Sequence, residues 1–311
     1  MTGTVYIAIY AGLVLFLVGC VGRIYQYART PFHLRWELYP VPHEEPSRVR
    51  HGGSYFESGE WWLRPQAIHH RGEWTAMFRE IVLLRGLWEF NRRLWLPSFL
   101  FHSGLYLSIV TVALAALEAA AGSWIPGVAS TALPAAAATA CRWTGSVGIA
   151  FVLIGAFWLL VRRIGDAALK NYTKAADVFN LLFFIATFAC LAAGFLGKAT
   201  ATVPPEGVVG GALHFDRSAH IGVIQGIGLI LASALVAYIP FTHMSHFIAK
   251  YFTWHSVRWD DRRNARNGVL EERIAASLRY RPTWSAPHVG ADGKKTWAEI
   301  ATTNPVEEAR K

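Results

Sequence analysis

Cysteine is scarce in this sequence, and charge is scarcer than in most soluble proteins. The three cysteines, Cys20, Cys141 and Cys190, lie far apart in apolar stretches, and no Cys-x-x-Cys or Cys-x-x-Cys-His motif occurs. By itself, such a chain is not expected to hold an iron–sulfur cluster or a covalently attached haem. Charged residues make up 16% of the 311 residues and hydrophobic residues 53%, whereas about a quarter of a soluble domain is charged. The composition therefore favours a membrane protein.

Long uncharged intervals predict five membrane-spanning helices. A hydrocarbon core of about 30 Å needs roughly 20 helical residues to cross it, and intervals of this kind cover residues 2–22, 94–117, 143–161, 178–197 and 218–249. The last interval is longer than a span requires, so we expect it to protrude or tilt. Residues 119–141 are also uncharged but contain Gly122, Pro126, Gly127 and Pro134, and we interpret them as a loop. The expected fold is an all-α integral membrane bundle of five transmembrane helices.

The basic residues are distributed unevenly along the chain. Of the 30 Lys and Arg residues, 11 lie in residues 23–93, 4 in residues 162–174 and 12 from residue 250 onward. The positive-inside rule places these regions in the cytoplasm, with the amino terminus outside and the carboxyl terminus inside the cytoplasmic (inner) membrane. The first span lacks a preceding basic residue, so we interpret it as a retained anchor. The net charge of +9 then reflects topology and does not predict nucleic-acid binding.

This topology divides the chain into four regions. Transmembrane helix 1 covers residues 1–29, a long cytoplasmic loop residues 30–93, helices 2–5 residues 94–249, and a cytoplasmic tail residues 250–311. The second half of the loop is expected to form an interfacial amphipathic helix, which would lie on lipid or dock a partner. Its apolar face would carry Trp74, Met77, Phe78, Ile81, Val82, Leu84 and Trp88. The polar tail is expected to dock on a partner or to be partly disordered.

Four histidines in or near the predicted spans are candidates for cofactor chemistry. His102 lies near the cytoplasmic start of the second helix, and His243 and His246 near the cytoplasmic end of the fifth, whereas His220 lies at its outer end. Ionisable residues inside a membrane are costly and often functional, and two antiparallel helices could clamp a bis-histidine haem b. For any single histidine, the alternative is an interfacial or hydrogen-bonding role.

Small residues near these histidines allow two interpretations. Ser103 and Gly104 follow His102, and Gly222, Gly226 and Gly228 lie along the fifth predicted helix. They could make room for a porphyrin face, or they could serve helix packing.

Short motifs around the histidines carry a family resemblance. The segment Phe101-His102-Ser-Gly-Leu-Tyr106 and the segment Pro240-Phe241-Thr-His-Met-Ser-His246 resemble the haem-binding helices of the gamma subunit of respiratory nitrate reductase. The loop segment Trp36-Glu-Leu-Tyr-Pro-Val-Pro-His43 instead resembles the cytochrome b subunits of sulfate-reducer transmembrane redox complexes, which are related to the membrane subunit of heterodisulfide reductase. The resemblance covers about residues 1 to 255.

The resemblance implies axial iron ligands and a haem count. It assigns His102 and His246 to the haem nearer the cytoplasm. At about 1.5 Å per helical residue, His243 would lie about 4.5 Å nearer the middle of the bilayer than His246, and it is given a propionate-contacting or alternative-ligand role. The positions of the outer haem ligands hold Val112 and Gly228, with His220 as the remaining candidate on that side. One haem b is therefore favoured over two.

The implied function is electron transfer between the quinone pool and a cytoplasmic iron–sulfur subunit of heterodisulfide-reductase-like or nitrate-reductase-beta-like type. The chain would be the electron-transfer subunit of a quinone-linked oxidoreductase complex, and an outer-side cytochrome c is a further candidate partner. Near the outer end, Glu118, Asp216, Arg217 and His220 could bind a quinone headgroup and take its protons, or could be ordinary interface residues. The alternative function is a cofactor-free membrane anchor for a cytoplasmic redox partner.

Overall fold

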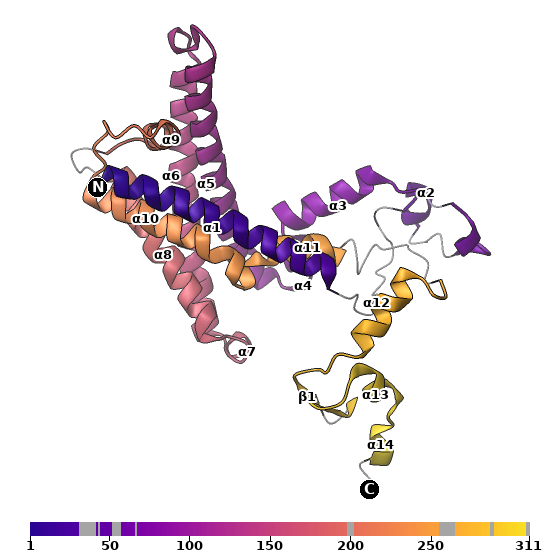
Figure 1. The fold of residues 1–311 in the computed structure, drawn as a ribbon. Helices are drawn as coiled ribbons and strands as arrows, with labels where there is room; N and C mark the ends of the chain where they lie inside the picture. Colours follow the sequence, from indigo (N-terminus) through magenta and orange to yellow (C-terminus); the bar gives the residue numbers. More distant parts are fainter. Residues whose placement is uncertain are drawn as a thin grey trace. The chain divides into compact units, whose positions relative to one another are not determined.

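The computed structural model of this chain is built almost entirely of α-helices (Figure 1). It describes residues 1–30, 42, 44–51, 57–65, 67–197, 202–254, 265–286 and 289–308. Within these residues, five helices are long and apolar enough to cross a membrane. They are α1 (Thr2–Arg29), α5 (Arg92–Trp124), α6 (Leu133–Gly165), α8 (Ala175–Leu196) and α10 (Val223–Tyr238), which a 3-10 turn extends to Phe241. The prediction of an all-α bundle is confirmed, and the chain is a multi-pass membrane protein.

Shorter elements flank these five helices. They are α2 (Pro46–Val49), η2 (Trp61–Leu63), α3 (His70–Val82), α4 (Arg85–Phe90), η3 (Val128–Ser130), α7 (Ala167–Lys170), α9 (Pro205–His214), η4 (Ile239–Phe241), η5 (His243–Ser245), α11 (His246–Thr253), α12 (Val269–Leu278), α13 (Trp297–Thr302) and α14 (Pro305–Glu308). Strands β1 (Ser285–Ala286) and β2 (Ala291–Asp292) pair antiparallel, with Ser285 opposite Asp292.

The chain forms two compact units. The bundle unit comprises Met1–Cys20 and Met77–Met244, and the peripheral unit comprises Val21–Ala76 and Ser245–Lys311. The bundle unit contains α5, α6, α8, α9, α10 and most of α1. This division is important for the histidines, because His102 and His243 belong to the bundle unit and His246 to the peripheral unit.

Glycines let α5 and α6 pack with their backbones in close contact. A Cβ atom added to Gly104 would lie 2.6 Å from the backbone nitrogen of Val152, and one added to Gly155 would lie 2.5 Å from that of Phe101. Small residues drive such packing in a membrane, because lipid tails leave no hydrophobic force between helices. The side chains of Thr111 and Thr144 add a 2.8 Å hydrogen bond between the two helices.

The other long helices extend this pair into a bundle. Helix α6 also packs against α8, and α8 packs against α10. At the α1–α10 contact, a Cβ atom on Gly12 would lie 2.6 Å from the carbonyl oxygen of Ser233, and one on Gly19 would lie 2.7 Å from Cβ of Pro240. Figure 1 draws α1 alongside α10. Each contact again depends on a residue without a side chain.

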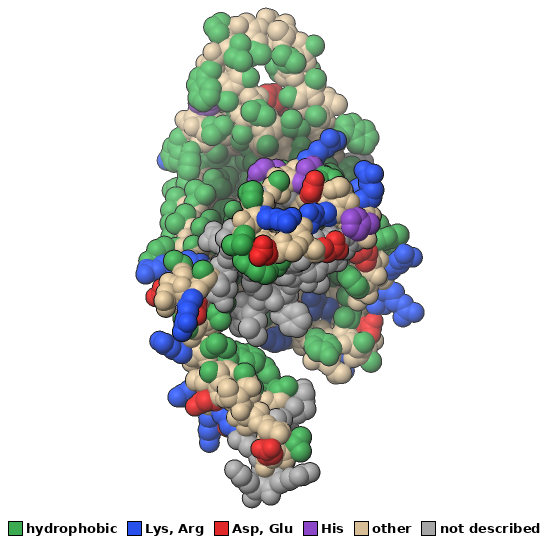
Figure 2. Space-filling model, turned by 90° about the vertical axis from the view of Figure 1, so that its right-hand side faces the viewer, with side chains coloured by type: hydrophobic (Ala, Val, Ile, Leu, Met, Phe, Trp, Pro, Cys, Tyr) green, Lys and Arg blue, Asp and Glu red, His purple; other side chains and the backbone are tan. Residues whose placement is uncertain are grey.

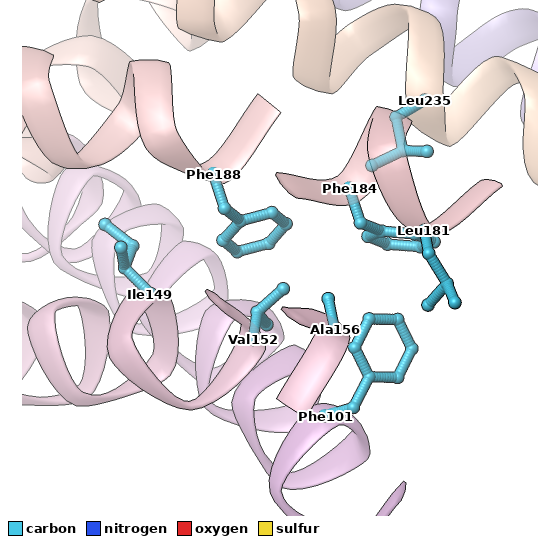
Figure 3. Close-up of a cluster of buried hydrophobic side chains, with 8 residues drawn as sticks. All are labelled: Phe101, Ile149, Val152, Ala156, Leu181, Phe184, Phe188 and Leu235. Atoms are coloured by element: carbon cyan, nitrogen blue, oxygen red, sulfur yellow. The ribbon is translucent and has the colours of Figure 1, made fainter. Parts of the chain in front are cut away.

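An apolar cluster joins four of these helices in the bundle unit (Figure 3). Its buried members are Phe101, Ile149, Val152, Ala156, Leu181, Phe184, Phe188 and Leu235. Phe101 and Phe184 meet edge to face with ring centroids 4.8 Å apart. Met244 packs against the same cluster, so residues next to His102 and His243 share one core.

The outward surface of the bundle is apolar, as expected for helices that face lipid. Ile109, Val112 and Leu117 on α5 are each more than half exposed, as are Phe157 and Val161 on α6. Figure 2 shows hydrophobic side chains covering the top of the view, over the ends of α5 and α6. In water such a surface would aggregate, whereas in a bilayer it is the favourable one.

The predicted loop over residues 119–141 is wrong for most of its length. Helix α5 continues to Trp124, α6 begins at Leu133, and the connection between them contains η3. Pro134 is accepted because it lies in the first turn of α6, where its missing N–H is not needed. The alanine-rich sequence around it favours a helix. The two 33-residue helices therefore extend beyond what a span requires.

The fifth predicted span, residues 218–249, is also corrected, because it is not one continuous helix. Helix α10 begins at Val223 and ends at Tyr238, and the 3-10 turns η4 and η5 follow. Pro240 lacks an amide N–H and its ring crowds the preceding turn, so the α-helix stops there. His220 consequently precedes α10, and His243 and His246 follow it. The depth difference calculated from a regular helix does not apply to these two histidines.

The predicted amphipathic helix forms as two segments. Leu84 adopts a left-handed backbone conformation, with φ 51°, between α3 and α4. Trp74, Phe78 and Trp88 are 70%, 59% and 45% exposed, which agrees with an apolar face that lies on lipid or a partner. The indole N–H of Trp95 donates to the Leu83 carbonyl at 2.8 Å, and the Tyr106 hydroxyl donates to the Ile81 carbonyl at 2.9 Å.

The end of the tail is folded in the region that the structure describes. Helix α12, the β1–β2 hairpin and α13 follow one another, and Trp284 meets Trp297 with ring centroids 5.7 Å apart. Helix α13 starts with a capping box in which Thr296 and Glu299 bond each other's backbone N–H groups. The loop motif of residues 36–43, apart from Pro42, lies outside the described residues.

Candidate functional site

The candidate residues lie at two ends of the bundle unit. We call the start of α5, the end of α6, the start of α8 and the end of α10 the His102 end. We call the end of α5, the start of α6, α9 and the segment before α10 the Glu118 end. His102 and His243 lie at the first end, and the predicted quinone residues lie near the second.

His102 is oriented by the backbone of its own helix. Its Nδ1 atom lies 2.7 Å from the carbonyl oxygen of Ser98, and because a carbonyl can only accept, Nδ1 carries the proton. The lone pair is then on Nε2. Histidine ligands of metals are usually held by such a hydrogen bond from the second ring nitrogen. His102 is partly buried on a membrane-spanning helix, next to Phe101 of the apolar cluster.

His243 and His246, the other two candidates for the inner haem, occupy different settings. The Nε2 atom of His243 lies 3.5 Å from Oδ1 of Asp177, and the His243 side chain is 59% exposed. His246 is the first residue of α11 in the peripheral unit. The pairing of His102 with His246 around one haem iron therefore stays a prediction. For His243, the structure adds a carboxylate partner that the sequence did not indicate.

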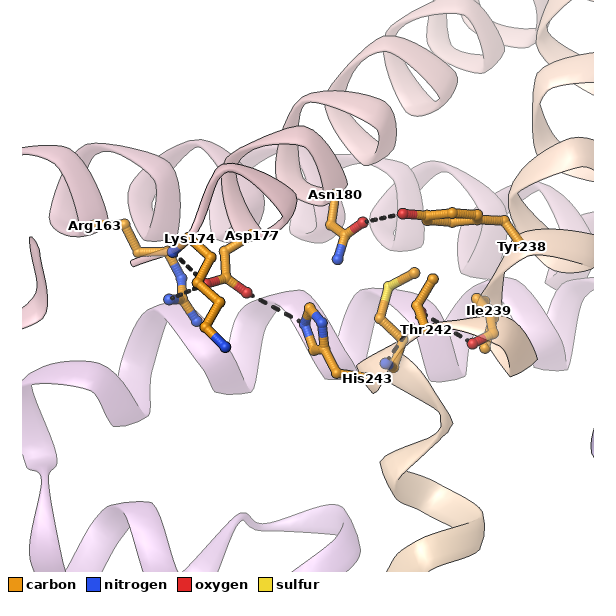
Figure 4. Close-up of polar contacts among 9 residues, drawn as sticks. Arg163, Lys174, Asp177, Asn180, Tyr238, Ile239, Thr242 and His243 are labelled. Carbon is orange, nitrogen blue, oxygen red and sulfur yellow. Dashed lines mark hydrogen bonds and ion pairs between the residues drawn. The ribbon is translucent and has the colours of Figure 1, made fainter. Parts of the chain in front are cut away.

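Asp177 organises the charges at the His102 end (Figure 4). It lies in the first turn of α8, where its Oδ2 atom accepts from the Lys174 backbone N–H at 2.9 Å. The same oxygen is 3.5 Å from Nη1 of Arg163 at the end of α6, and Asp177 is only 15% exposed. A carboxylate near a helix N-terminus is favoured by the helix dipole. Asp177 thus links α6, α8 and the turn that carries His243.

A buried amide lies one helical turn further along α8. Asn180 is 5% exposed, and its Oδ1 atom accepts a 3.0 Å hydrogen bond from the Tyr238 hydroxyl. Its Nδ2 atom is buried and has no hydrogen-bond partner among the described residues. In Figure 4 this nitrogen points toward the turn that carries Thr242 and His243. The sequence analysis missed Asn180, although an amide inside the apolar run of residues 178–197 was a visible signal.

The residues that the sequence analysis assigned to a haem b fit one only in part. His102 supplies the correct donor atom in the correct tautomer. The glycines expected to make room for a porphyrin are instead used in packing, because a Cβ atom on Gly104 would meet α6 and one on Gly228 would lie 3.0 Å from the backbone of Cys190 in α8. Gly226 faces Met1. The helix-packing interpretation of these three glycines is therefore the one that their contacts support.

At the Glu118 end, two glutamates approach each other. Glu118 lies on α5 and Glu206 in the first turn of α9, close enough for their charges to repel. Each has one carboxyl oxygen, Oε2, that is buried without a hydrogen-bond partner in the part of the chain that the structure describes. His214 of α9 bonds Ser123 of α5 at 2.9 Å and holds the two helices together. Glu206 was missed because no pattern in the sequence indicates that α9 packs on α5.

Asp216, Arg217 and His220 are exposed in the segment between α9 and α10. Asp216 accepts hydrogen bonds of 2.9 Å from the backbone N–H and from the hydroxyl of Ser218, and these bonds lower its carboxyl pKa. A lowered pKa makes Asp216 a poor acceptor for quinol protons. The Arg217 guanidinium stacks 4.8 Å from the ring centroid of Phe215. Their predicted quinone role is not tested by these contacts.

Comparison of the chain with protein-family models, curated proteins and solved structures found no match. Within the described residues, no group of three or more His, Cys, Asp or Glu side chains could hold a metal ion. A haem held by two histidines needs no such group. The function must therefore be argued from the chain's own residues.

Proposed function

We propose that this chain is the haem b subunit of a quinone-linked redox complex in the cytoplasmic membrane, with its amino terminus outside and its carboxyl terminus inside. The observation that carries the proposal is the geometry of His102. A partly buried histidine on a membrane-spanning helix is costly, and its Nδ1–H bond to the Ser98 carbonyl directs the Nε2 lone pair as a metal ligand requires. Family resemblance supplies His246 as the second ligand.

The chain's residues would each have a limited role. His102 and His246 would hold the iron, and the Asp177–His243 pair would carry charge near the same end. When bound, haem b supplies one-electron transfer between donor and acceptor. Because Val112 and Gly228 replace the outer ligands of the family pattern, one haem is proposed instead of two.

The proposal requires partner subunits. With no cluster-binding cysteine motif in the chain, electrons must pass to or from another protein, and a cytoplasmic iron–sulfur subunit fits this need. The excess of Lys and Arg in residues 23–93 and beyond residue 250 supports a cytoplasmic location of the loop and the tail. A cytochrome c on the outer side is a further proposed partner.

Absorbance spectroscopy of the purified full-length protein tests the haem directly. We expect a low-spin b-type spectrum that changes on reduction with dithionite, and its loss in the His102→Ala variant, because the iron would lose one axial ligand. His214→Ala is the matched control, since it removes a histidine that bonds Ser123 at the other end. A normal low-spin spectrum in His102→Ala would remove His102 from the site.

A second function, a cofactor-free membrane anchor for a redox partner, is favoured by one observation. Gly104 and Gly228 are used in helix contacts and leave no room where the sequence suggested a porphyrin face. An anchor would copurify with its partner and show no dithionite-dependent absorbance in any preparation. The wild-type spectrum therefore separates the two functions.

A further inference from the structure

In the side-chain amide of Asn180, the oxygen is hydrogen-bonded but the nitrogen has no partner among the described residues. The oxygen accepts from Tyr238 at 3.0 Å, whereas the nitrogen is buried. Buried donors are almost always paired, so an orphan indicates a missing acceptor. Gln225 on α10 gives the contrast. That amide, 2% exposed, bonds both the backbone N–H and the carbonyl of Val203 and is fully satisfied.

The surroundings of the orphan nitrogen combine a polar side and an apolar side. The polar side is the Asp177–His243 pair, and the nitrogen points toward the turn that carries His243 (Figure 4). The apolar side is the buried cluster, to which Leu181, the next residue after Asn180, belongs and against which Met244 packs. A ligand here would need a neutral hydrogen-bond acceptor attached to an apolar body.

The neighbouring aromatic residues connect this place to the lipid-facing surface. The Tyr238 ring contacts those of Phe179 and Phe183, with both ring centroids 6.0 Å from its own. Phe179 is 54% exposed on α8. An apolar ligand dissolved in the bilayer would therefore reach the Tyr238–Asn180 pair past aromatic side chains, without first entering water.

We propose that Asn180, together with His243 and its partner Asp177, binds a carbonyl oxygen of a quinone headgroup at the His102 end of the bundle. The inference rests on the proposed quinone-linked function and locates its substrate. A quinone carbonyl is an uncharged acceptor on an apolar ring, which matches an amide donor beside an aromatic and aliphatic cluster. The site differs from the one expected at Glu118, Asp216, Arg217 and His220.

The test measures quinone binding to the full-length protein in lipid nanodiscs. Decylubiquinone is titrated by equilibrium binding against wild type, Asn180→Leu and the control Gln225→Leu. Asn180→Leu should weaken the affinity at least tenfold, because the amide donor is lost. Gln225→Leu should lower thermal stability and leave the affinity unchanged. Equal affinity for wild type and Asn180→Leu would overturn the site.

Photolabelling keeps the proposal falsifiable if Asn180→Leu does not fold. An azidoquinone irradiated with the wild-type protein should label peptides that contain residues 175–185 or 238–244. Labelling confined to peptides from α9 or residues 215–222 would overturn the proposal and support the Glu118 end.

A haem spectrum of each sample separates this inference from the proposed function. If haem is present and the quinone affinity does not depend on Asn180, the quinone site is refuted and the haem proposal stands. Asn180-dependent binding without haem supports the site and refutes the haem proposal.

Discussion

The His102 end and the Glu118 end of the bundle differ in how their acidic side chains are paired. At the His102 end, Asp177 contacts Arg163, His243 and the backbone N–H of Lys174. At the Glu118 end, Glu118 and Glu206 are close enough for their charges to repel, and each has a buried carboxyl oxygen without a partner in the described chain. In a low-dielectric setting, both the attraction between opposite charges and the repulsion between like charges are stronger than in water. The contacts of Asp177 therefore stabilise the fold, and the repulsion between Glu118 and Glu206 destabilises it.

The two ends also differ in packing. Gly104, near the His102 end of α5, contacts the backbone of α6, whereas a Cβ atom on Gly122, at the other end of the same helix, would meet nothing within 4 Å. Along one helix, a glycine is therefore tightly packed at one position and faces open space at another. The difference shows that the presence of glycine in a membrane helix does not by itself indicate close packing.

The largest expected effect is a difference in cysteine labelling between residues proposed to lie on opposite sides of the membrane. In a background without Cys20, Cys141 and Cys190, a cysteine at Ser123 should react with a membrane-impermeant maleimide in intact cells. A cysteine at Ala301 in α13 should react only after lysis, because the tail is proposed to be cytoplasmic. The reverse pattern would invert the proposed orientation and the side of the haem with it.

The packing difference predicts opposite effects of two glycine substitutions on α5. Gly104→Val should lower the free energy of unfolding by about 3 kcal/mol, because the new side chain would overlap the backbone of α6. Gly122→Ala should raise it by up to about 1 kcal/mol, because alanine favours the helix and meets no neighbour. Thermal unfolding in detergent measures both. Similar losses of stability in both variants would contradict the difference in packing between the two glycine positions.

The charge difference predicts opposite effects of neutralising an acid. Asp177→Asn should lower stability by about 1 kcal/mol, since Arg163 and His243 would lose their partner and α8 its N-terminal carboxylate. Glu118→Gln should raise stability by a comparable or smaller amount, about 0.5–1 kcal/mol, because its repulsion from Glu206 would end. Unfolding at pH 7.5 is the measurement. A loss of stability in Glu118→Gln would show that the acid pair is neutral or bound to a cation.

The smallest effect concerns Asp216 at the Glu118 end. Because bonds from Ser218 lower the carboxyl pKa of Asp216 in the folded state, they stabilise the fold above the unfolded pKa, about 3.9. This stabilisation is lost as the pH falls below that value. Ser218→Ala should therefore reduce stability slightly at pH 6 and leave it unchanged near pH 2.5. Ser130→Ala, in the η3 turn, is the control, and an equal change at both pH values would rule out a role of ionised Asp216.

The sequence determined the number and the placement of the membrane-spanning helices. Length and apolar composition decide this, because a bilayer demands about 20 uncharged helical residues wherever they occur. The same reasoning failed over residues 119–141, where Gly122 and Pro134 suggested a loop. The helical preference of the neighbouring residues outweighed these two breakers, since Pro134 falls in the first turn of α6 and three alanines precede Gly122.

The sequence also suggested His102 as a candidate ligand, because its apolar surroundings and position are visible in the linear order of residues, and this assignment stays a prediction. The sequence could not reveal that His243 pairs with Asp177, that Glu118 lies close enough to Glu206 for repulsion, or that the nitrogen of Asn180 has no partner among the described residues. Each of these observations depends on contacts between residues that lie on different structural elements. Only the tertiary structure decides them, because burial and pairing depend on which helix faces pack together and not on the spacing within one helix.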